Sequence, residues 1–85
     1  MKIQLRFFAA LREKLGVSQE SIDIPDDIKT IDDLKNYLCK RNALWSKVLA
    51  GNQVIRCALN QVMVDSSTPL SDDAEVAFFP PVTGG

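Results

Sequence analysis

The chain has 85 residues, of which 46% are apolar and 25% are charged, and this composition is typical of one small globular domain. A net charge of -1 gives no surplus of cations to neutralise a run of phosphates, so we expect no nucleic-acid partner. The absence of histidine removes Ser-His-Asp and Cys-His machinery and every His-ligated zinc site, so we expect neither catalytic machinery in this chain nor a metal site.

The first elements are a strand, a short helix and a second strand. Residues 2–7 alternate polar and apolar side chains, which predicts a half-buried strand. Residues 9–16 are rich in helix formers and end in a glycine suited to a left-handed cap, which predicts a helix of two turns. Residues 17–25 predict a strand that ends at a proline and lies at the sheet edge, because proline cannot donate to a strand ladder.

The second half begins with the main helix. Thr30 offers an N-cap hydroxyl, and the helix is predicted to run from there to near Arg41. Residues 42–52, NALWSKVLAGN, predict another helical turn or two, with Trp45 covering the core. Residues 54–64 predict two short strands joined at Asn60 and Gln61, and residues 75–80, EVAFFP, predict the last strand.

Together these elements predict an α+β fold of two layers. One main helix and short extra helices would lie on one face of a mixed sheet of about five strands, because the chain is too short to cover both faces with helices. We expect the first and last strands to be neighbours at the centre of this sheet. No apolar run is long enough to span a bilayer and the start lacks a secretory signal, so we expect a cytoplasmic protein with no membrane partner.

The two cysteines, Cys39 and Cys57, lie far apart in sequence and outside a C-x-x-C spacing. This pattern fits a reducing compartment better than a disulfide scaffold. We expect both thiols to behave as small buried apolar groups. A reactive or cross-linked thiol is the alternative.

Three large apolar residues do not fit a core-facing phase. Phe8 and Phe79 break the alternation of their strands, and Met63 lies between two valines. We expect these side chains on the open face of the sheet or its rim, where they would bind a partner, because aromatic residues and methionine are enriched in interfaces. The alternative is that loops or a second helix cover them.

The last residues, FFPPVTGG, predict a spacer followed by a slender end. Pro80 and Pro81 fix their φ angles and favour extended polyproline geometry, so we expect a domain of residues 1–80 and a projecting, flexible tail of residues 81–85. Without Cβ atoms, Gly84 and Gly85 would fit a narrow channel and leave the terminal carboxylate accessible. A carboxylate needs activation before acyl chemistry, most simply as a mixed anhydride with a nucleotide phosphate. A frayed terminus without a role is the alternative.

The stretches RFFAALREKLG, ALNQVMV and EVAFFPPVTGG together resemble the small subunits of molybdopterin synthase, which are sulfur carriers of the ubiquitin-like β-grasp superfamily. The resemblance covers nearly the whole chain and implies a β-grasp fold. The chain departs from the pattern in SDDAEVAFF, where relatives commonly carry a glycine in the turn before the last strand and this chain has Ala74.

The resemblance implies a chemical role for Gly85. An activating enzyme would adenylate its carboxylate with ATP, and sulfur from a persulfide donor would replace AMP to give a thiocarboxylate. The tail would enter the large catalytic subunit, in a 2:2 heterotetramer, and give sulfur to cyclic pyranopterin monophosphate to form the molybdopterin dithiolene. No stably bound cofactor is implied. The residues that would thread the channel are Pro80, Pro81, Val82, Thr83 and Gly84.

The resemblance also assigns the docking residues. Phe8, Met63 and Phe79 would form a hydrophobic surface of this chain that binds the large subunit. Arg12 would be a polar contact beside this surface or a solvated surface residue. Three other roles stay open. A thiamine-pathway sulfur carrier ends in the same glycines, but it is generally shorter and is not expected to carry FFPPV. A covalent protein modifier would transfer the activated Gly85 to a lysine amine, and a plain binding module would not use the tail.

Overall fold

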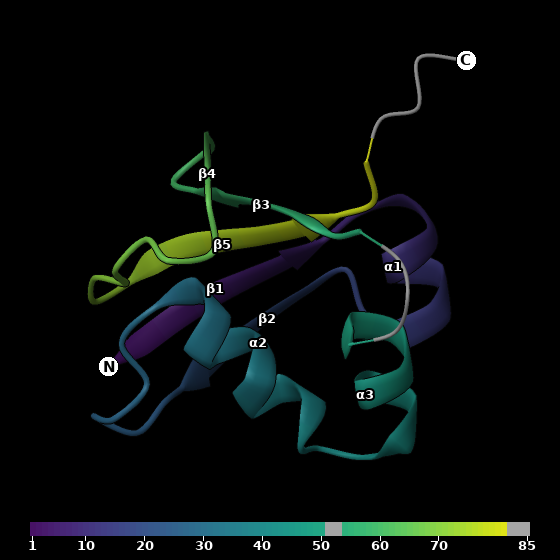
Figure 1. Cartoon of the computed structure of the whole chain (residues 1–85), viewed down its shortest axis with the longest axis horizontal. Helices are drawn as coiled ribbons and strands as arrows, with labels where there is room; N and C mark the ends of the chain where they lie inside the picture. Colours follow the sequence, from purple (N-terminus) through teal and green to yellow (C-terminus); the bar gives the residue numbers. More distant parts are fainter. Residues whose placement is uncertain (51–53, 82–85) are drawn as a thin grey trace.

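The computed structural model describes residues 1–50 and 54–81, which form a mixed five-stranded sheet packed against helices (Figure 1). This architecture confirms the predicted α+β fold of two layers. None of the helices in these two segments has the length and apolar character that a bilayer crossing needs. The elements in chain order are β1 (Lys2–Phe7), α1 (Ala9–Leu15), β2 (Gln19–Asp23), α2 (Ile31–Cys39), α3 (Ala43–Ala50), β3 (Arg56–Leu59), β4 (Val62–Val64) and β5 (Ala74–Phe79).

The sheet has the strand order β2-β1-β5-β3-β4. The first and last strands, β1 and β5, are parallel neighbours, and the other three pairings are antiparallel. The predicted central position of these two strands and the predicted edge position of β2 are therefore confirmed. As a result, β5 is flanked on both sides, and Pro80 and Pro81 follow the middle strand of the sheet.

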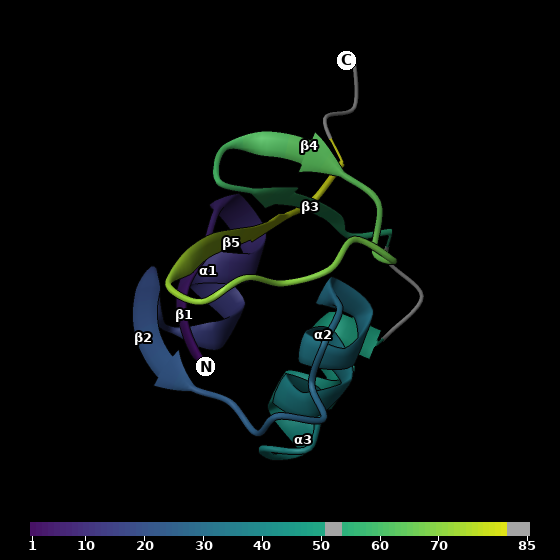
Figure 2. The same cartoon turned by 90° about the vertical axis from the view of Figure 1, so that its left-hand side faces the viewer.

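The core lies between the sheet and the helices α2 and α3, which are on the same side of the sheet (Figures 1 and 2). The period-two alternation of β1 directs Ile3, Leu5 and Phe7 into this core, with no more than 1% of each exposed. Trp45 closes the core from α3, as predicted, because its ring meets the Phe7 ring edge-on at 5.5 Å between centroids. The sheet face away from α2 and α3, called here the open face, is covered by no helix among residues 1–50 and 54–81.

The main helix begins where its cap predicts. The Thr30 hydroxyl accepts a hydrogen bond from the Asp33 backbone N–H at 3.1 Å, and the Asp33 carboxylate accepts one from the Thr30 backbone N–H at 3.2 Å. The helix ends at Cys39, two residues before the predicted end near Arg41. Arg41 does not serve the helix terminus, because its guanidinium forms a bidentate pair with Glu20 on β2 at 2.9 and 2.6 Å.

Two turns position the last strands. Asn60 and Gln61 join β3 to β4 with φ of 50° and 69°, which confirms the predicted hairpin joint. The prediction that Ala74 lies in the turn before β5 is wrong, because Ala74 is the first residue of β5 and only 3% exposed. The left-handed position falls one residue earlier, on Asp73 with φ of 63°. Aspartate tolerates this region better than most residues, so a glycine is not required there.

Candidate functional site

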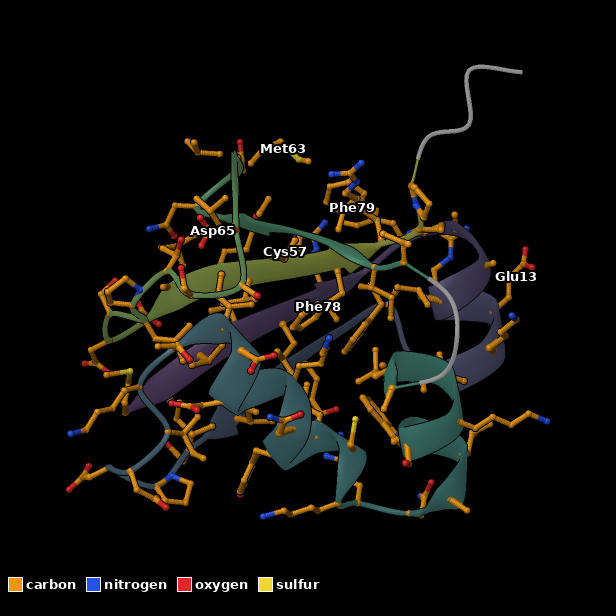
Figure 3. The ribbon with its side chains drawn as sticks, viewed as in Figure 1. Glu13, Cys57, Met63, Asp65, Phe78 and Phe79 are labelled. Atoms are coloured by element: carbon orange, nitrogen blue, oxygen red, sulfur yellow. The ribbon has the colours of Figure 1, made fainter. Side chains whose placement is uncertain are left out.

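The open face carries an apolar surface beside the end of β5, called here the open-face patch, which is made by Phe8, Ala58, Met63, Ala77 and Phe79. Pairing fixes its composition, because directly paired residues of neighbouring strands point to the same side of a sheet. Ala77 pairs with Ala58 and Ala58 pairs with Met63, so these side chains form a row across β5, β3 and β4. Figure 3 shows Met63 and Phe79 on the side of the sheet opposite to Phe78.

Two aromatic rings form one end of the patch. Phe8 follows β1 in an extended conformation, and its backbone N–H donates to the Phe78 carbonyl at 3.2 Å, so the β1–β5 pairing continues one residue further. The Phe8 and Phe79 rings meet in a T-shaped arrangement with 6.5 Å between centroids. The rest of the patch is flat, because Ala58 and Ala77 have methyl side chains and are 7% and 6% exposed.

Phe8 and Met63 remain strongly exposed, at 40% and 58%. The alternative in which loops or a second helix cover them therefore does not hold within residues 1–50 and 54–81. An exposed group of aromatic, methionine and alanine side chains is what a protein interface would bury. The structure thus brings Phe8 and Phe79 into contact and places Met63 on the same face, while their role in binding a partner stays a prediction.

The turn after Phe8 is strained. Ala9 begins α1 with φ of 52°, a left-handed conformation that costs an L-residue roughly 1 to 2 kcal/mol. Within the same turn the Phe8 carbonyl accepts hydrogen bonds from the backbone N–H groups of Leu11 and Arg12 at 3.2 and 3.4 Å. The chain therefore reverses from strand to helix within one residue. This abrupt change keeps the Phe8 ring on the open face and sends Leu11 into the core, where it is 1% exposed.

Arginines lie near the aromatic end of the patch. The Arg6 guanidinium lies over the Phe8 ring at 5.8 Å from its centroid, and its Nη1 is 3.7 Å from Glu75 Oε1. Arg56 pairs with Phe79 across β3 and β5, which places it at the same end of the open face. Arg12 is exposed on α1, one turn after Phe8, and it takes part in neither of the two ion pairs found among the described residues. Its predicted contact with a partner is not tested.

Two prolines come directly after the aromatic pair. Pro80 and Pro81 are half-buried and follow Phe79 without an intervening residue. The predictions made for Val82, Thr83, Gly84 and Gly85 fall outside the described residues. The boundary between a domain of residues 1–80 and a tail of residues 81–85 therefore also stays a prediction.

The prediction that both cysteines are small buried apolar groups is confirmed for Cys57 but not for Cys39, which is only half-buried. Both are free thiols, Cys57 buried in the core and Cys39 half-buried on α2. Desolvation raises the pKa of both thiols, so each is protonated at neutral pH and is a poor nucleophile. Residues 1–50 and 54–81 contain no group of three or more Cys, Asp or Glu side chains placed to hold a metal ion.

Three contributions to this site were not predicted from the sequence: the flat floor of Ala58 and Ala77, the position of Arg6 over Phe8, and Arg56 beside Phe79. The floor and the position of Arg56 depend on which strands are neighbours and in which register. The alternation of Lys2 to Phe7 does place Arg6 on the open face, and this was the one signal available.

Comparison with known proteins identifies similar chains along the full length. Residues 5–85 match the ThiS family. The chain is 36% identical over 83 residues to the molybdopterin synthase sulfur carrier subunit of Escherichia coli K12, which covers 98% of this chain and 99% of that protein. It is 29% identical over 92 residues to small archaeal modifier protein 3 of Haloferax volcanii, and the alignment covers 100% of both chains.

Solved structures agree with these relatives. The crystal structure of SAMP1 from Haloferax volcanii superposes with a TM-score of 0.79 at 23% identity and covers 100% of both chains, which shows a shared ubiquitin-like β-grasp fold. A chain in the complex of subunits 1 and 2 of molybdopterin-converting factor from Helicobacter pylori 26695 superposes with a TM-score of 0.67 at 27% identity, again over 100% of both chains. The predicted β-grasp fold is therefore confirmed.

Proposed function

The chain belongs to the ThiS family, and from this premise we propose that it is the sulfur carrier subunit of a molybdopterin synthase. The observation that carries the proposal is the full-length similarity, at 36% identity, to a subunit with that name. The open-face patch supports it, because a carrier that hands its cargo to another protein needs a surface for docking. The proposed carrier has no Ser-His-Asp triad, since the chain lacks histidine.

The proposed chemistry occurs on the carboxylate of Gly85. An activating enzyme transfers AMP from ATP to this carboxylate and releases pyrophosphate, which converts an unreactive group into an acyl adenylate. Sulfur from a persulfide donor, together with two electrons from a thiol, then replaces AMP and leaves a thiocarboxylate. In the synthase this sulfur passes to cyclic pyranopterin monophosphate, and two such transfers complete the dithiolene of molybdopterin.

The proposed docking uses the open-face patch and the tail together. Phe8, Met63 and Phe79 would pack against the large subunit, and Arg12 would form a polar contact beside them. Because Pro80 and Pro81 follow Phe79 directly, docking of the aromatic pair would fix the point from which residues 82–85 enter the partner's active site. The similarity to a chain in a complex of the two subunits of molybdopterin-converting factor supports this arrangement. We place the reaction in the cytoplasm and the assembly at two copies of each subunit.

A second candidate function is covalent protein modification. It is favoured by the full-length similarity to small archaeal modifier protein 3. Both functions would share the acyl adenylate of Gly85, and they would differ in the group that displaces AMP. A lysine amine would give an isopeptide bond, whereas sulfur would give the thiocarboxylate.

Intact-mass analysis of the protein isolated from its own cells tests the proposal. A thiocarboxylate adds about 16 Da, the same shift as methionine sulfoxide, so fragmentation must localise the gain to Gly85 rather than to Met1 or Met63. A variant lacking Gly85 is the matched control and should show no gain at its new end. If the mass gain were never found at Gly85 while Gly85 was found linked to lysines, the modifier function would replace the carrier function.

A further inference from the structure

The outer edge of β2 lies at the end of the sheet far from β3 and β4, which carry part of the open-face patch (Figure 2). Its five residues pair with β1 in a continuous register from Gln19 to Asp23. Proline, lysine and a β-bulge, which commonly block an exposed sheet edge, are absent from these five residues. Of the two charged side chains on the strand, Glu20 is paired with Arg41 and Asp23 lies at the end. This edge is therefore a regular template for another strand.

The hydrogen bonds to β1 identify which backbone groups face outward. The Met1 amino group donates to the Ile24 carbonyl at 3.2 Å, and the Ile24 N–H donates to the Met1 carbonyl at 2.8 Å. Two strands of an antiparallel pair exchange such bonds at every second residue. Glu20 and Ile22 therefore direct their backbone groups toward β1, and three residues direct theirs away from the sheet: Gln19, Ser21 and Asp23.

A groove of about 480 Å³ lies beside this edge, between β2 and the C-terminal end of α2. Ile22 and Tyr37 are half-buried against the core and supply apolar surface to the groove. Lys40 supplies a positive charge, and it takes part in neither ion pair within the described part of the chain. The remaining lining residues are Asp23 and Arg41.

Arg41 fixes the position of β2 relative to the helices that line the groove. Its guanidinium donates two hydrogen bonds to the Glu20 carboxylate and lies over the Trp45 ring at 4.6 Å from the centroid. One side chain therefore ties the outer strand to the helical layer. A partner would not have to order this edge on binding, and preorganisation of this kind lowers the cost of association.

We propose that the outer edge of β2 binds an extended segment of a partner protein, which adds one strand to the sheet. Alternate side chains of this segment point into the groove, where apolar residues contact Ile22 and Tyr37 and a carboxylate lies beside Lys40. The main-chain hydrogen bonds give affinity, and the groove selects the side chains. The open-face patch lies toward the other end of the sheet, so the same molecule can hold both partners at once, and this inference does not depend on the proposed sulfur chemistry.

The test uses the full chain and a synthetic probe, acetyl-Thr-Val-Thr-Val-Thr-Glu-Thr-amide, with amide hydrogen exchange followed by NMR. Strand addition should slow the exchange of the outward amides of Gln19, Ser21 and Asp23, whereas Glu20 and Ile22 are protected by β1 before the probe is added. A control probe with lysine in place of glutamate should bind at least about fivefold more weakly, as expected for loss of a partly exposed ion pair.

Two variants make the test specific. Ser21→Pro removes an outward N–H without removing a bond to β1, so it should abolish probe binding and keep the fold, which circular dichroism checks. Lys40→Glu should weaken the probe about fivefold, while Lys47→Glu, the same charge change outside the groove, should not. If Ser21→Pro does not fold, the Lys40 variant and the lysine probe decide whether the segment binds at this edge.

Three results would overturn the inference. The first is an absence of protection at the outward amides when the probe is saturating. The second is equal binding of the glutamate and lysine probes. The third is protection of the same amides without probe at high protein concentration, which would assign this edge to a second copy of the chain.

Discussion

Truncation of Phe8 to alanine tests the docking role of the open-face patch most directly. The ring is 40% exposed, and a phenylalanine side chain buries about 150 to 250 Å² when fully covered, so a partner would remove about 80 Å² of it from water. At about 25 cal/mol per Å² this area corresponds to about 2 kcal/mol. Phe8→Ala should therefore raise the Kd for the large synthase subunit about thirtyfold.

The assay is isothermal titration calorimetry of the purified chain against the large subunit. Leu44→Ala is the matched control, because Leu44 is 46% exposed but lies on α3, in the helical layer. Phe8→Ala also loses the T-shaped contact with Phe79, worth about 0.5 to 1.5 kcal/mol, so urea unfolding must confirm that the variant is folded at the assay temperature. A Kd unchanged by Phe8→Ala, or raised equally by Leu44→Ala, would refute the reasoning.

Three further predictions concern the tail, the main helix and the acid stability. Deletion of Gly85 should abolish sulfur transfer in a reconstituted synthase assay and leave the unfolding midpoint unchanged, because a terminal residue contributes little packing; full activity of the deletion would contradict the proposed acyl carrier. Thr30→Ala should lower the free energy of unfolding by about 1 kcal/mol in urea titrations through loss of the capping box. Thr30→Ser keeps the capping hydroxyl and should retain most of this stability. Hydrogen bonds from Arg41 hold the pKa of the Glu20 carboxyl below its ordinary value, so its stabilising contribution is complete above the unfolded pKa and is lost as the pH falls through the folded pKa. Between about pH 5 and pH 3 the unmodified chain should therefore lose more stability than Glu20→Gln, and parallel pH profiles would show that the pair contributes nothing measurable.

Local patterns predicted most of the elements, because each is decided by residues close in sequence. The alternation of residues 2–7 predicted β1 with its observed bounds, and Thr30 predicted the start of α2. Gly16 predicted the left-handed cap of α1, where φ is 73°. The exposed phase of Phe8 and Phe79 also follows from local alternation, and so the two most prominent residues of the patch could be found from the sequence.

Features that depend on pairing between distant strands could not be predicted. The floor of the patch requires Ala58 to lie opposite Ala77, a register that no local pattern contains. The bond between Arg41 and Glu20 requires β2 to lie beside the end of α2, and from the sequence Arg41 marked only the predicted end of the main helix. The turn before β5 was misplaced by one residue because Asp73, rather than a glycine, adopts the positive φ.

The parallel pairing of β1 with β5 has a consequence for biosynthesis. Ile3 pairs with Ile22 on β2 but meets its partner on β5 only when Ala74 has been made, so the middle of the sheet stays incomplete until the ribosome has translated β5. Such non-local pairing slows folding, and a nascent or prematurely terminated product that lacks β5 leaves one edge of β1 unpaired. Phe8 acquires its ring partner at the same late moment. A partner that binds both rings together would therefore discriminate against polypeptides in which β5 has not yet joined the sheet.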